Sequence, residues 1–170
     1  MKKLLLYLAE MQRRGLIANY ALGGATALIY YFEPIQTQDI DVFVVLAADS
    51  QPLVNLSPIY SFLSDQGARA EKEYVVIDDV PVQFLVPYNE LVEEAVHRAI
   101  IGDFDGVEVR IPPLEYLMAI MVQTGRGKDK ARLEALRSHP ELYSQPMFEE
   151  ILARFQLTGR WEKILKWMQS

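Results

Sequence analysis

Apolar residues recur along this chain with the period of a helix in some segments and the period of a strand in others. Between residues 2 and 14 they return every three or four positions, as on an amphipathic helix, and Gly15 ends the pattern. Residues 39–46 give the clearest strand pattern, because Val, Ile and Phe dominate them. The same criteria predict further strands over 19–22, 69–77, 80–86 and 107–111, and further helices over 25–32, 57–66, 89–99, 114–124, 128–137, 147–155 and 159–168.

The order of these segments predicts the fold class. Strands and helices are mixed along the chain up to Pro113, and only helices follow. We therefore expect an α/β (α+β) fold, in which helices flank a mixed β-sheet and the C-terminal part is all-helical. The expected boundary lies within residues 138–146, so that residues 1–137 form the main domain and residues 138–170 a helical extension packed on it.

Local signals refine the ends of these elements. Asp78 and Asp79 separate two strand patterns and predict a hairpin turn. Asn89 is expected to cap the helix that follows it. Ser57 and Pro58 predict the cap and the first residue of an earlier helix.

Composition and charge narrow the possible functions. The 170 residues contain no cysteine, which excludes disulfides, cysteine-ligated zinc and thiol catalysis. No apolar run approaches the roughly 18 residues that span a bilayer, so we expect a soluble, cytoplasmic protein with no membrane partner. A net charge of −6 argues against a sequence-independent nucleic-acid coat. Residues 126–137 still carry five basic residues against two acidic ones, which is also the pattern of a solvated helix face.

The chemistry of the chain centres on Asp39 and Asp41. The strand period places both carboxylates on one face, about 7 Å apart. Two carboxylates at the mouth of an apolar strand repel each other and resist desolvation unless a cation lies between them. Oxygen ligands of this kind favour Mg²⁺ or Mn²⁺, and Mg²⁺ completes its shell with water and substrate phosphates. The alternative is a solvated strand end without a metal.

A glycine turn precedes this strand. In Leu22-Gly23-Gly24 the chain passes from a predicted strand to a predicted helix without a side chain at the last two positions. Backbone amides at such a turn can receive phosphate oxygens. An ordinary tight turn would have the same sequence.

The glycine turn, the short helix and the Asp-x-Asp strand at this spacing resemble the DNA polymerase beta-like nucleotidyltransferase superfamily. Residues 20–45, with Thr37 two positions before Asp39, are most similar to the minimal nucleotidyltransferases and the AbiEii-like toxin group. A second similarity covers residues 117–136, where the sequence Gly-Arg-Gly-Lys-Asp at 125–129 joins two predicted helices.

This resemblance implies transfer of a nucleoside monophosphate from a nucleoside triphosphate to an acceptor hydroxyl. Asp39 and Asp41 fall on the acids that bind the metal and act in catalysis. Gln83 falls where a third, assisting acid is expected. The resemblance also implies a nucleotide-binding role for Gly23, Gly24, Arg126, Lys128 and Asp129.

The sequence departs from the superfamily pattern at the third acid. A glutamine amide can accept a hydrogen bond or weakly contact a metal, but Gln83 cannot act as a base. Met121 stands where relatives often place a lysine, for which Lys128 could compensate, and Arg132 stands where the residue is often acidic.

These departures leave more than one function open. The first is an active nucleotidyltransferase, whose acceptor could be an RNA such as tRNA, a protein or a small molecule. The second is a degenerate module of a toxin–antitoxin-like system, which binds a nucleotide or a cognate partner protein without catalysis. The third is a structural interaction domain without a metal.

Overall fold

The computed structural model describes residues 1–32, 37–47 and 55–169. Its centre is a five-stranded sheet made of β1 (Ile17–Leu22), β2 (Ile40–Leu46), β3 (Arg69–Glu71), β4 (Tyr74–Ile77) and β5 (Val80–Leu85). The strand order is β1-β2-β5-β4-β3. β2 pairs antiparallel with β1 and parallel with β5, and β4 is antiparallel to both β5 and β3. The sheet is therefore mixed, which confirms the predicted class.

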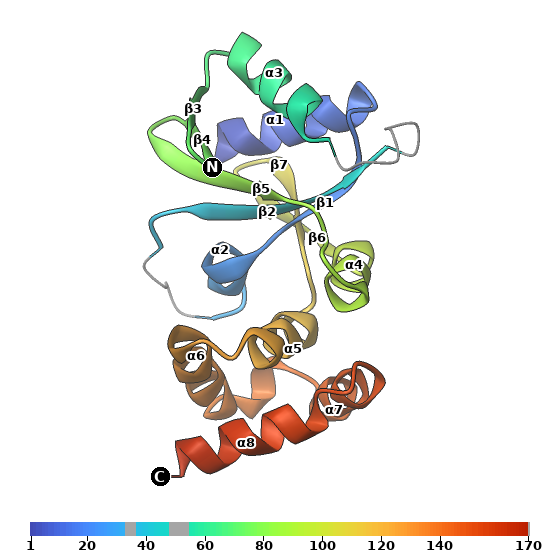
Figure 1. The fold of residues 1–170 in the computed structure, drawn as a ribbon, viewed down its shortest axis with the longest axis vertical. Coiled ribbons are helices and arrows are strands. Elements are labelled where there is room, and N and C mark those ends of the chain that lie inside the picture. The colour runs from blue at the N-terminus through green and yellow to red at the C-terminus, as the bar shows by residue number, and fades with distance from the viewer. Residues whose placement is uncertain (33–36, 48–54, 170) are drawn as a thin grey trace.

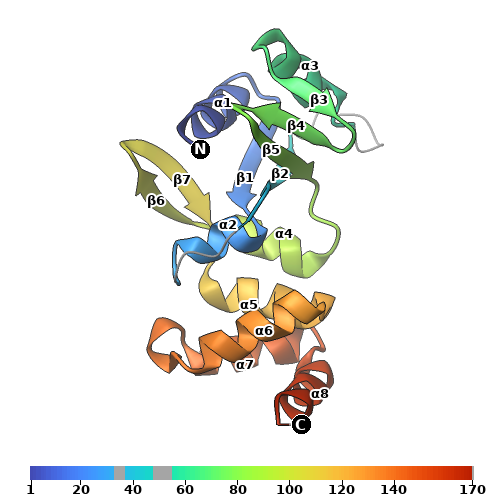
Figure 2. The ribbon, with the colours of Figure 1, turned by 90° about the vertical axis from the view of Figure 1, so that its left-hand side faces the viewer.

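Helices cover both faces of the sheet (Figure 1). One face carries α1 (Lys2–Arg13) and α3 (Ser57–Asp65), and the other carries α2 (Gly24–Ile29) and α4 (Glu90–His97). Figure 2 shows the later helices stacked beyond α2 and α4, at the end of the molecule opposite α1. These helices are α5 (Leu114–Thr124), α6 (Gly127–Arg137), α7 (Gln145–Arg154) and α8 (Thr158–Met168).

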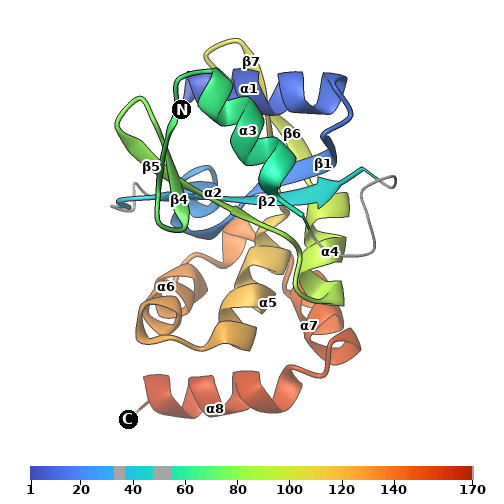
Figure 3. The ribbon, with the colours of Figure 1, turned by 45° about the horizontal axis from the view of Figure 1, so that its top comes forward.

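The C-terminal helices share the core of the sheet-bearing part. α7 and α8 both pack against α5 (Figure 3). Phe148, Leu152 and Ile164 from these two helices belong to the same buried cluster as Leu117 of α5 and Val42 of β2. The division of the chain near residue 138 stays a prediction. Among the described residues, no helix combines the length and the apolar composition needed to cross a membrane.

Strand β2 is buried on both faces, and its alternation sets the position of the site. Val42 and Val44 pack in the main core with Leu8 of α1. Phe43 points to the other face, where it packs with Val92 of α4. Since side chains alternate along a strand, Asp41 shares the face of Phe43.

Two strand predictions need correction. The strand predicted over 69–77 is two strands, because Lys72 adopts a positive φ of 57° and β3 turns back on β4. The turn contains neither Gly nor Pro, so the usual turn signal is missing. The sequence pattern also did not predict β6 (Ile100–Phe104), which pairs with β7 (Val107–Ile111) in a separate two-stranded sheet. β6 is largely exposed and so lacks the burial pattern of the other strands.

The local signals had mixed outcomes. Asp78 and Asp79 both adopt positive φ, of 49° and 62°, and form the predicted hairpin turn between β4 and β5. The Asn89 side chain accepts a hydrogen bond of 2.9 Å from the Val92 amide and caps α4 as expected. The predicted Ser57 cap is wrong: Ser57 is the first residue of α3, and its amide donates to Asn55 Oδ1 at 2.9 Å.

A carboxylate ties α4 to the C-terminal helices. The Tyr116 hydroxyl of α5 donates a hydrogen bond of 2.6 Å to Glu94 of α4. Arg154 of α7 forms an ion pair with the same carboxylate. The Tyr116 hydrogen bond and Arg154 lower the pKa of Glu94 below its ordinary 4.5. Glu94 therefore joins three helices through charge-assisted contacts.

We predict that Glu94→Gln destabilises the protein at neutral pH by about 1 kcal/mol. Arg154 would keep a hydrogen-bond acceptor at residue 94 but would lose the negative charge of its ion pair. The lowered pKa gives a contribution that is fully present above pH 4.5 and is lost as the pH falls through the folded-state pKa. Urea unfolding at pH 7 and at pH 3 should therefore show a difference from wild type at pH 7 only. Glu93→Gln on the exposed side of α4 is the matched control, and equal urea midpoints for both variants at pH 7 would contradict the prediction.

Candidate functional site

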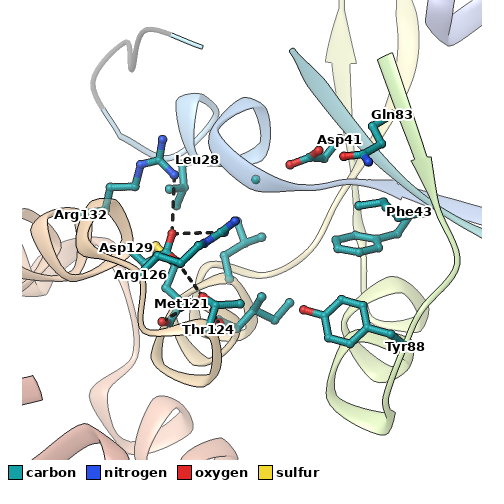
Figure 4. A pocket seen from close by; sticks show the side chains of 14 residues that line it. Leu28, Asp41, Phe43, Gln83, Tyr88, Met121, Thr124, Arg126, Asp129 and Arg132 are labelled. Carbon is teal, nitrogen blue, oxygen red and sulfur yellow. Dashed lines mark hydrogen bonds and ion pairs between the residues drawn. The ribbon is translucent and has the colours of Figure 1, made fainter. Parts of the chain in front are cut away.

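A pocket lies where β2, β5, α2, α5 and α6 meet (Figure 4). Its volume is about 180 Å³. This is below the roughly 300–1,000 Å³ typical of sites that enclose a drug-sized ligand, so the pocket can surround only part of a nucleotide. The polar residues that line it are Gly24, Asp41, Gln83, Tyr88, Thr124, Arg126, Asp129 and Arg132.

Asp41 and Gln83 form one wall of this pocket. They are direct neighbours in the parallel register of β2 and β5. Figure 4 shows both side chains on the same side of these strands. The structure thus places the predicted third position beside Asp41, and the residue there offers an amide in place of a carboxylate.

The glycine turn is shaped by contact with β2. The Gly23 amide donates a hydrogen bond of 2.8 Å to the Asp41 carbonyl oxygen, and this donor is no longer available to a phosphate. Gly24 has a positive φ of 54°, and a Cβ at this position would lie 2.3 Å from Asp41 Oδ2. Glycine is therefore required at residue 24 both by conformation and by space. Of the two predicted phosphate-binding glycines, Gly24 lines the pocket.

Asp41 is the electrostatic centre of the site. Burial raises the pKa of Asp41 above its ordinary 3.8, and the negative charge of Asp39 raises it further. Lys128, Arg126 and Arg132 act in the opposite direction on this pKa. Each of these four charged side chains is therefore within electrostatic reach of Asp41, although Asp39 and Lys128 are absent from the pocket lining.

Asp39 lies just before β2 and faces a different hollow. The Thr37 hydroxyl donates hydrogen bonds to the Asp39 backbone oxygen at 2.9 Å and to Oδ1 at 3.2 Å. Tyr74, Lys72 and Glu71 line this second hollow with it. The two aspartates are close enough for the charge of Asp39 to raise the pKa of Asp41. Of the pair, Asp41 lines the main pocket and Asp39 lines the second hollow.

Asp129 organises the opposite wall. Its side chain is 1% exposed and accepts hydrogen bonds from Arg126 Nε and the Thr124 hydroxyl, both at 2.7 Å. Arg132 lies 3.9 Å from the same carboxylate. A buried carboxylate requires such partners, and in return it holds two guanidinium groups against the pocket (Figure 4). This is the arrangement expected when Asp129 orients a basic residue.

Sequence reasoning missed part of the lining. Arg132 was noted only as a departure from the family pattern, although its position one helical turn after Asp129 was a usable signal. Tyr88, 58% exposed, and Phe43 approach each other with ring centroids 6.4 Å apart. Phe43 shares the strand face of Asp41, whereas no local pattern marks Tyr88 as a site residue. Met121, which stands where relatives often place a lysine, lines the pocket with an apolar side chain that is 6% exposed.

The donor atoms fit one kind of metal. Within the described ranges, no group of three or more His, Cys, Asp or Glu side chains is placed to hold an ion. Asp41 offers a desolvated carboxylate, and Gln83 offers an amide oxygen beside it. Mg²⁺ requires only one or two carboxylates when substrate phosphates and water supply its remaining ligands. The site suits such an ion and does not suit a metal held by protein groups alone.

Solved structures share this fold. A nucleotidyltransferase-like antigenic protein from Paracoccidioides brasiliensis superposes with a TM-score of 0.60 and 14% identity, over 97% of this chain and 91% of that one. The solution structure of the antibiotic-resistance factor ANT(2'')-Ia superposes with a TM-score of 0.56 and 16% identity, over 97% of this chain and 95% of that one. Its crystal structure with adenylyl-2''-tobramycin gives a TM-score of 0.54 and 17% identity, over 88% and 92%. No family model and no curated protein matches the sequence. The chain therefore has the fold of nucleotidyltransferase-like proteins.

We predict that Gly24→Ala destabilises the protein by about 2 kcal/mol or more, because an L-residue at positive φ costs about 1–2 kcal/mol and its Cβ would also displace the Asp41 carboxylate. Gly159→Ala in α8 is the control, since nothing lies within 4 Å of a Cβ there. Chemical denaturation should show a loss for the first variant and none for the second. Equal stability of Gly24→Ala and wild type would show that the turn does not press on Asp41.

We predict that Asp41→Asn raises the melting temperature of the ligand-free protein. The raised pKa means that the folded state favours the protonated carboxyl, so wild type loses stability as the pH rises from 3.8 through the folded-state pKa. The variant should therefore exceed wild type at pH 7.5, and the difference should shrink toward pH 3.5. Glu150→Gln on exposed α7 removes the same charge as a control. A lower melting temperature for Asp41→Asn at pH 7.5 would contradict this account.

Proposed function

We propose that this chain is a metal-dependent nucleotidyltransferase that moves a nucleoside monophosphate from a nucleoside triphosphate to an acceptor hydroxyl. The carrying observation is the pocket in which half-buried Asp41 faces Arg126 and Arg132, both held by Asp129. A carboxylate opposite two guanidinium groups suits a ligand that carries both a cation and phosphates. The fold shared with nucleotidyltransferase-like proteins supports this assignment.

Each residue has a distinct part in binding the donor. Asp41, with Asp39 nearby and the Gln83 amide oxygen beside it, would hold Mg²⁺ or Mn²⁺. This ion would neutralise phosphate charge and fix the orientation of the triphosphate. Gly24 lines the pocket beside Asp41, where its backbone would lie next to a bound phosphate. Tyr88 presents an exposed ring at the pocket, on which the nucleoside could lie.

The reaction follows from this placement. The acceptor hydroxyl oxygen attacks the α-phosphorus, the bond from that phosphorus to the bridging oxygen of the β-phosphate breaks, and pyrophosphate leaves with the electron pair. Arg126 and Arg132 face the charge that develops on the phosphates, and exposed Lys128 can approach it from the same helix. The Gln83 amide cannot take up the hydroxyl proton, so the proton passes to water. Without a general base, we expect transfer to be slower by about 10²- to 10⁴-fold than with one.

A second function has its own supporting observation. Gln83 lies beside Asp41 where the superfamily pattern expects an acid. A degenerate module of a toxin–antitoxin-like system, related to the minimal or AbiEii-like nucleotidyltransferases, would keep nucleotide or partner binding and lose transfer. The acceptor of the active form is open among RNA such as tRNA, a protein and a small molecule. The adenylyl-2''-tobramycin bound to ANT(2'')-Ia illustrates the last class.

We predict that ATP or GTP binds the wild-type protein only with Mg²⁺, and that Asp41→Asn weakens this binding at least about tenfold, as expected for loss of a charged partner worth about 1.5–3 kcal/mol. Calorimetric titration measures both effects, with Glu150→Gln as the charge-matched control. Release of labelled pyrophosphate from γ-labelled nucleotide measures transfer, with tRNA, a protein or an aminoglycoside supplied as the acceptor. Gln83→Asp should accelerate this release on the order of 10²-fold if an acid there acts as the base.

The outcomes separate the two functions. Mg²⁺-dependent binding with pyrophosphate release supports the enzyme. Binding without release in the presence of each class of acceptor, in both wild type and Gln83→Asp, rejects the enzyme and supports the degenerate module. No nucleotide binding by folded wild-type protein rejects the enzyme and the nucleotide-binding form of the degenerate module.

A further inference from the structure

Charge is divided unevenly along this acidic chain. Residues 1–125 contain 8 Lys and Arg against 17 Asp and Glu, whereas residues 126–170 contain 9 against 6. The net charge of −6 therefore conceals an acidic sheet-bearing part and a basic helical end. Net charge argues against a general nucleic-acid coat, but a local surface follows its own charge.

Most of the basic residues at this end also lack acidic partners. Most arginines elsewhere form ion pairs, for example Arg13 and Arg14 with Glu10. In the part of the chain that the structure describes, six cations on α6 and α8 have no carboxylate oxygen within 4.0 Å. They are Lys128, Lys130, Arg137, Arg160, Lys163 and Lys166. Lys128 acts on the pKa of Asp41 and so lies toward the pocket, and we call the other five the α6–α8 basic surface.

The surface contains a hollow between the two helices. Lys130, Arg160 and Lys163 line this hollow, which has a volume of about 480 Å³. Lys130 Nζ lies 5.1 Å from the ring centroid of Trp167, and this ring is 46% exposed. Cations beside an exposed aromatic ring are the combination by which proteins bind single-stranded nucleic acids, through phosphates and stacked bases.

The hollow and the Asp41 pocket share a wall. Thr124 and Asp129 line the pocket, whereas Gly125 and Lys130, from the same short segment, line the hollow. Arg160 of α8 donates a hydrogen bond of 3.3 Å to the Thr124 backbone oxygen. A ligand in the hollow therefore lies directly across the α5–α6 turn from the proposed donor site.

The cations on α8 extend over a greater length than one phosphate group would cover. Arg160, Lys163 and Lys166 follow one another at intervals of three residues along one side of α8, over about 9 Å of helix axis. We propose that the α6–α8 basic surface binds the phosphodiester backbone of a single-stranded nucleic acid. That the bound strand is also the acceptor rests on the proposed function, whereas the binding itself does not.

The test uses the full chain without nucleotide or Mg²⁺. Fluorescence anisotropy of labelled 20-nucleotide RNA and DNA strands measures the dissociation constant from 0.05 to 0.5 M NaCl. The test variant is Lys130→Gln/Lys163→Gln, which leaves Arg160 and its bond to Thr124 in place. The control is Lys2→Gln/Lys3→Gln, which removes the same charge from α1 at the opposite end of the molecule.

The expected effect follows from counterion release. Each phosphate contact on a single strand contributes about 0.7 to the slope of log affinity against log salt, so loss of two contacts lowers the slope by about 1.4 and weakens binding roughly 25-fold at 0.1 M salt. The control should match wild type in both quantities. Stronger binding of RNA than of DNA would assign RNA as the strand, and equal binding would assign any single strand.

Three results would overturn the proposal. The first is no salt-dependent binding of either strand by wild type, and the second is an equal loss in the test variant and the control. The third is binding of poly-glutamate, lost in the test variant, without binding of either strand, which would assign an acidic polypeptide. Repeating the titration with Asp41→Asn keeps this test separate from the donor site, because loss of nucleotide binding there leaves strand binding intact.

Discussion

The contact between the Gly23-Gly24 turn and Asp41 is the constraint on which the site depends. The turn passes so close to β2 that Gly23 hydrogen-bonds the Asp41 backbone and Gly24 leaves no space for a side chain beside the Asp41 carboxylate. This places a carboxylate in a desolvated position, where burial and Asp39 both disfavour its charge. The ligand-free fold therefore carries an unfavourable group that a bound cation would relieve, as is common where a site is arranged for function.

The opposite wall comes from a part of the chain about ninety residues later, and it depends on one buried carboxylate. Asp129 holds Arg126 and Arg132 against the pocket, and their positive charge partly compensates the burial of Asp41. The turn that carries Arg126 follows α5, on which α7 and α8 pack. The C-terminal helices thus support the geometry of the site through α5, and their packing is part of what keeps two guanidinium groups opposite Asp41.

Local chemistry predicted much of this architecture from the sequence, and long-range geometry accounts for the rest. The Val- and Ile-rich pattern of β2, the Asp78–Asp79 hairpin and the Asn89 cap each depend on residues close in sequence, and each is present. The β3–β4 turn was missed because its positive-φ residue is a lysine. Asp39 lines a second hollow beside Tyr74 of β4, a neighbour distant in sequence that no local pattern indicates.

The shared wall between the pocket and the α6–α8 basic surface links the two proposals physically. Arg126 and Arg132 form ion pairs with Asp129. In the described structure, Lys130, Arg160 and Lys163 have no carboxylate partner. The paired cations suit the orientation of one triphosphate, because a guanidinium held by a carboxylate loses little further freedom on binding. The lysines without a carboxylate partner keep their full charge, which suits a flexible polymer that binds through many weak contacts. The short α5–α6 segment thus separates the Asp41 pocket, which suits the orientation of a triphosphate, from the α6–α8 basic surface, which suits the binding of a nucleic-acid strand.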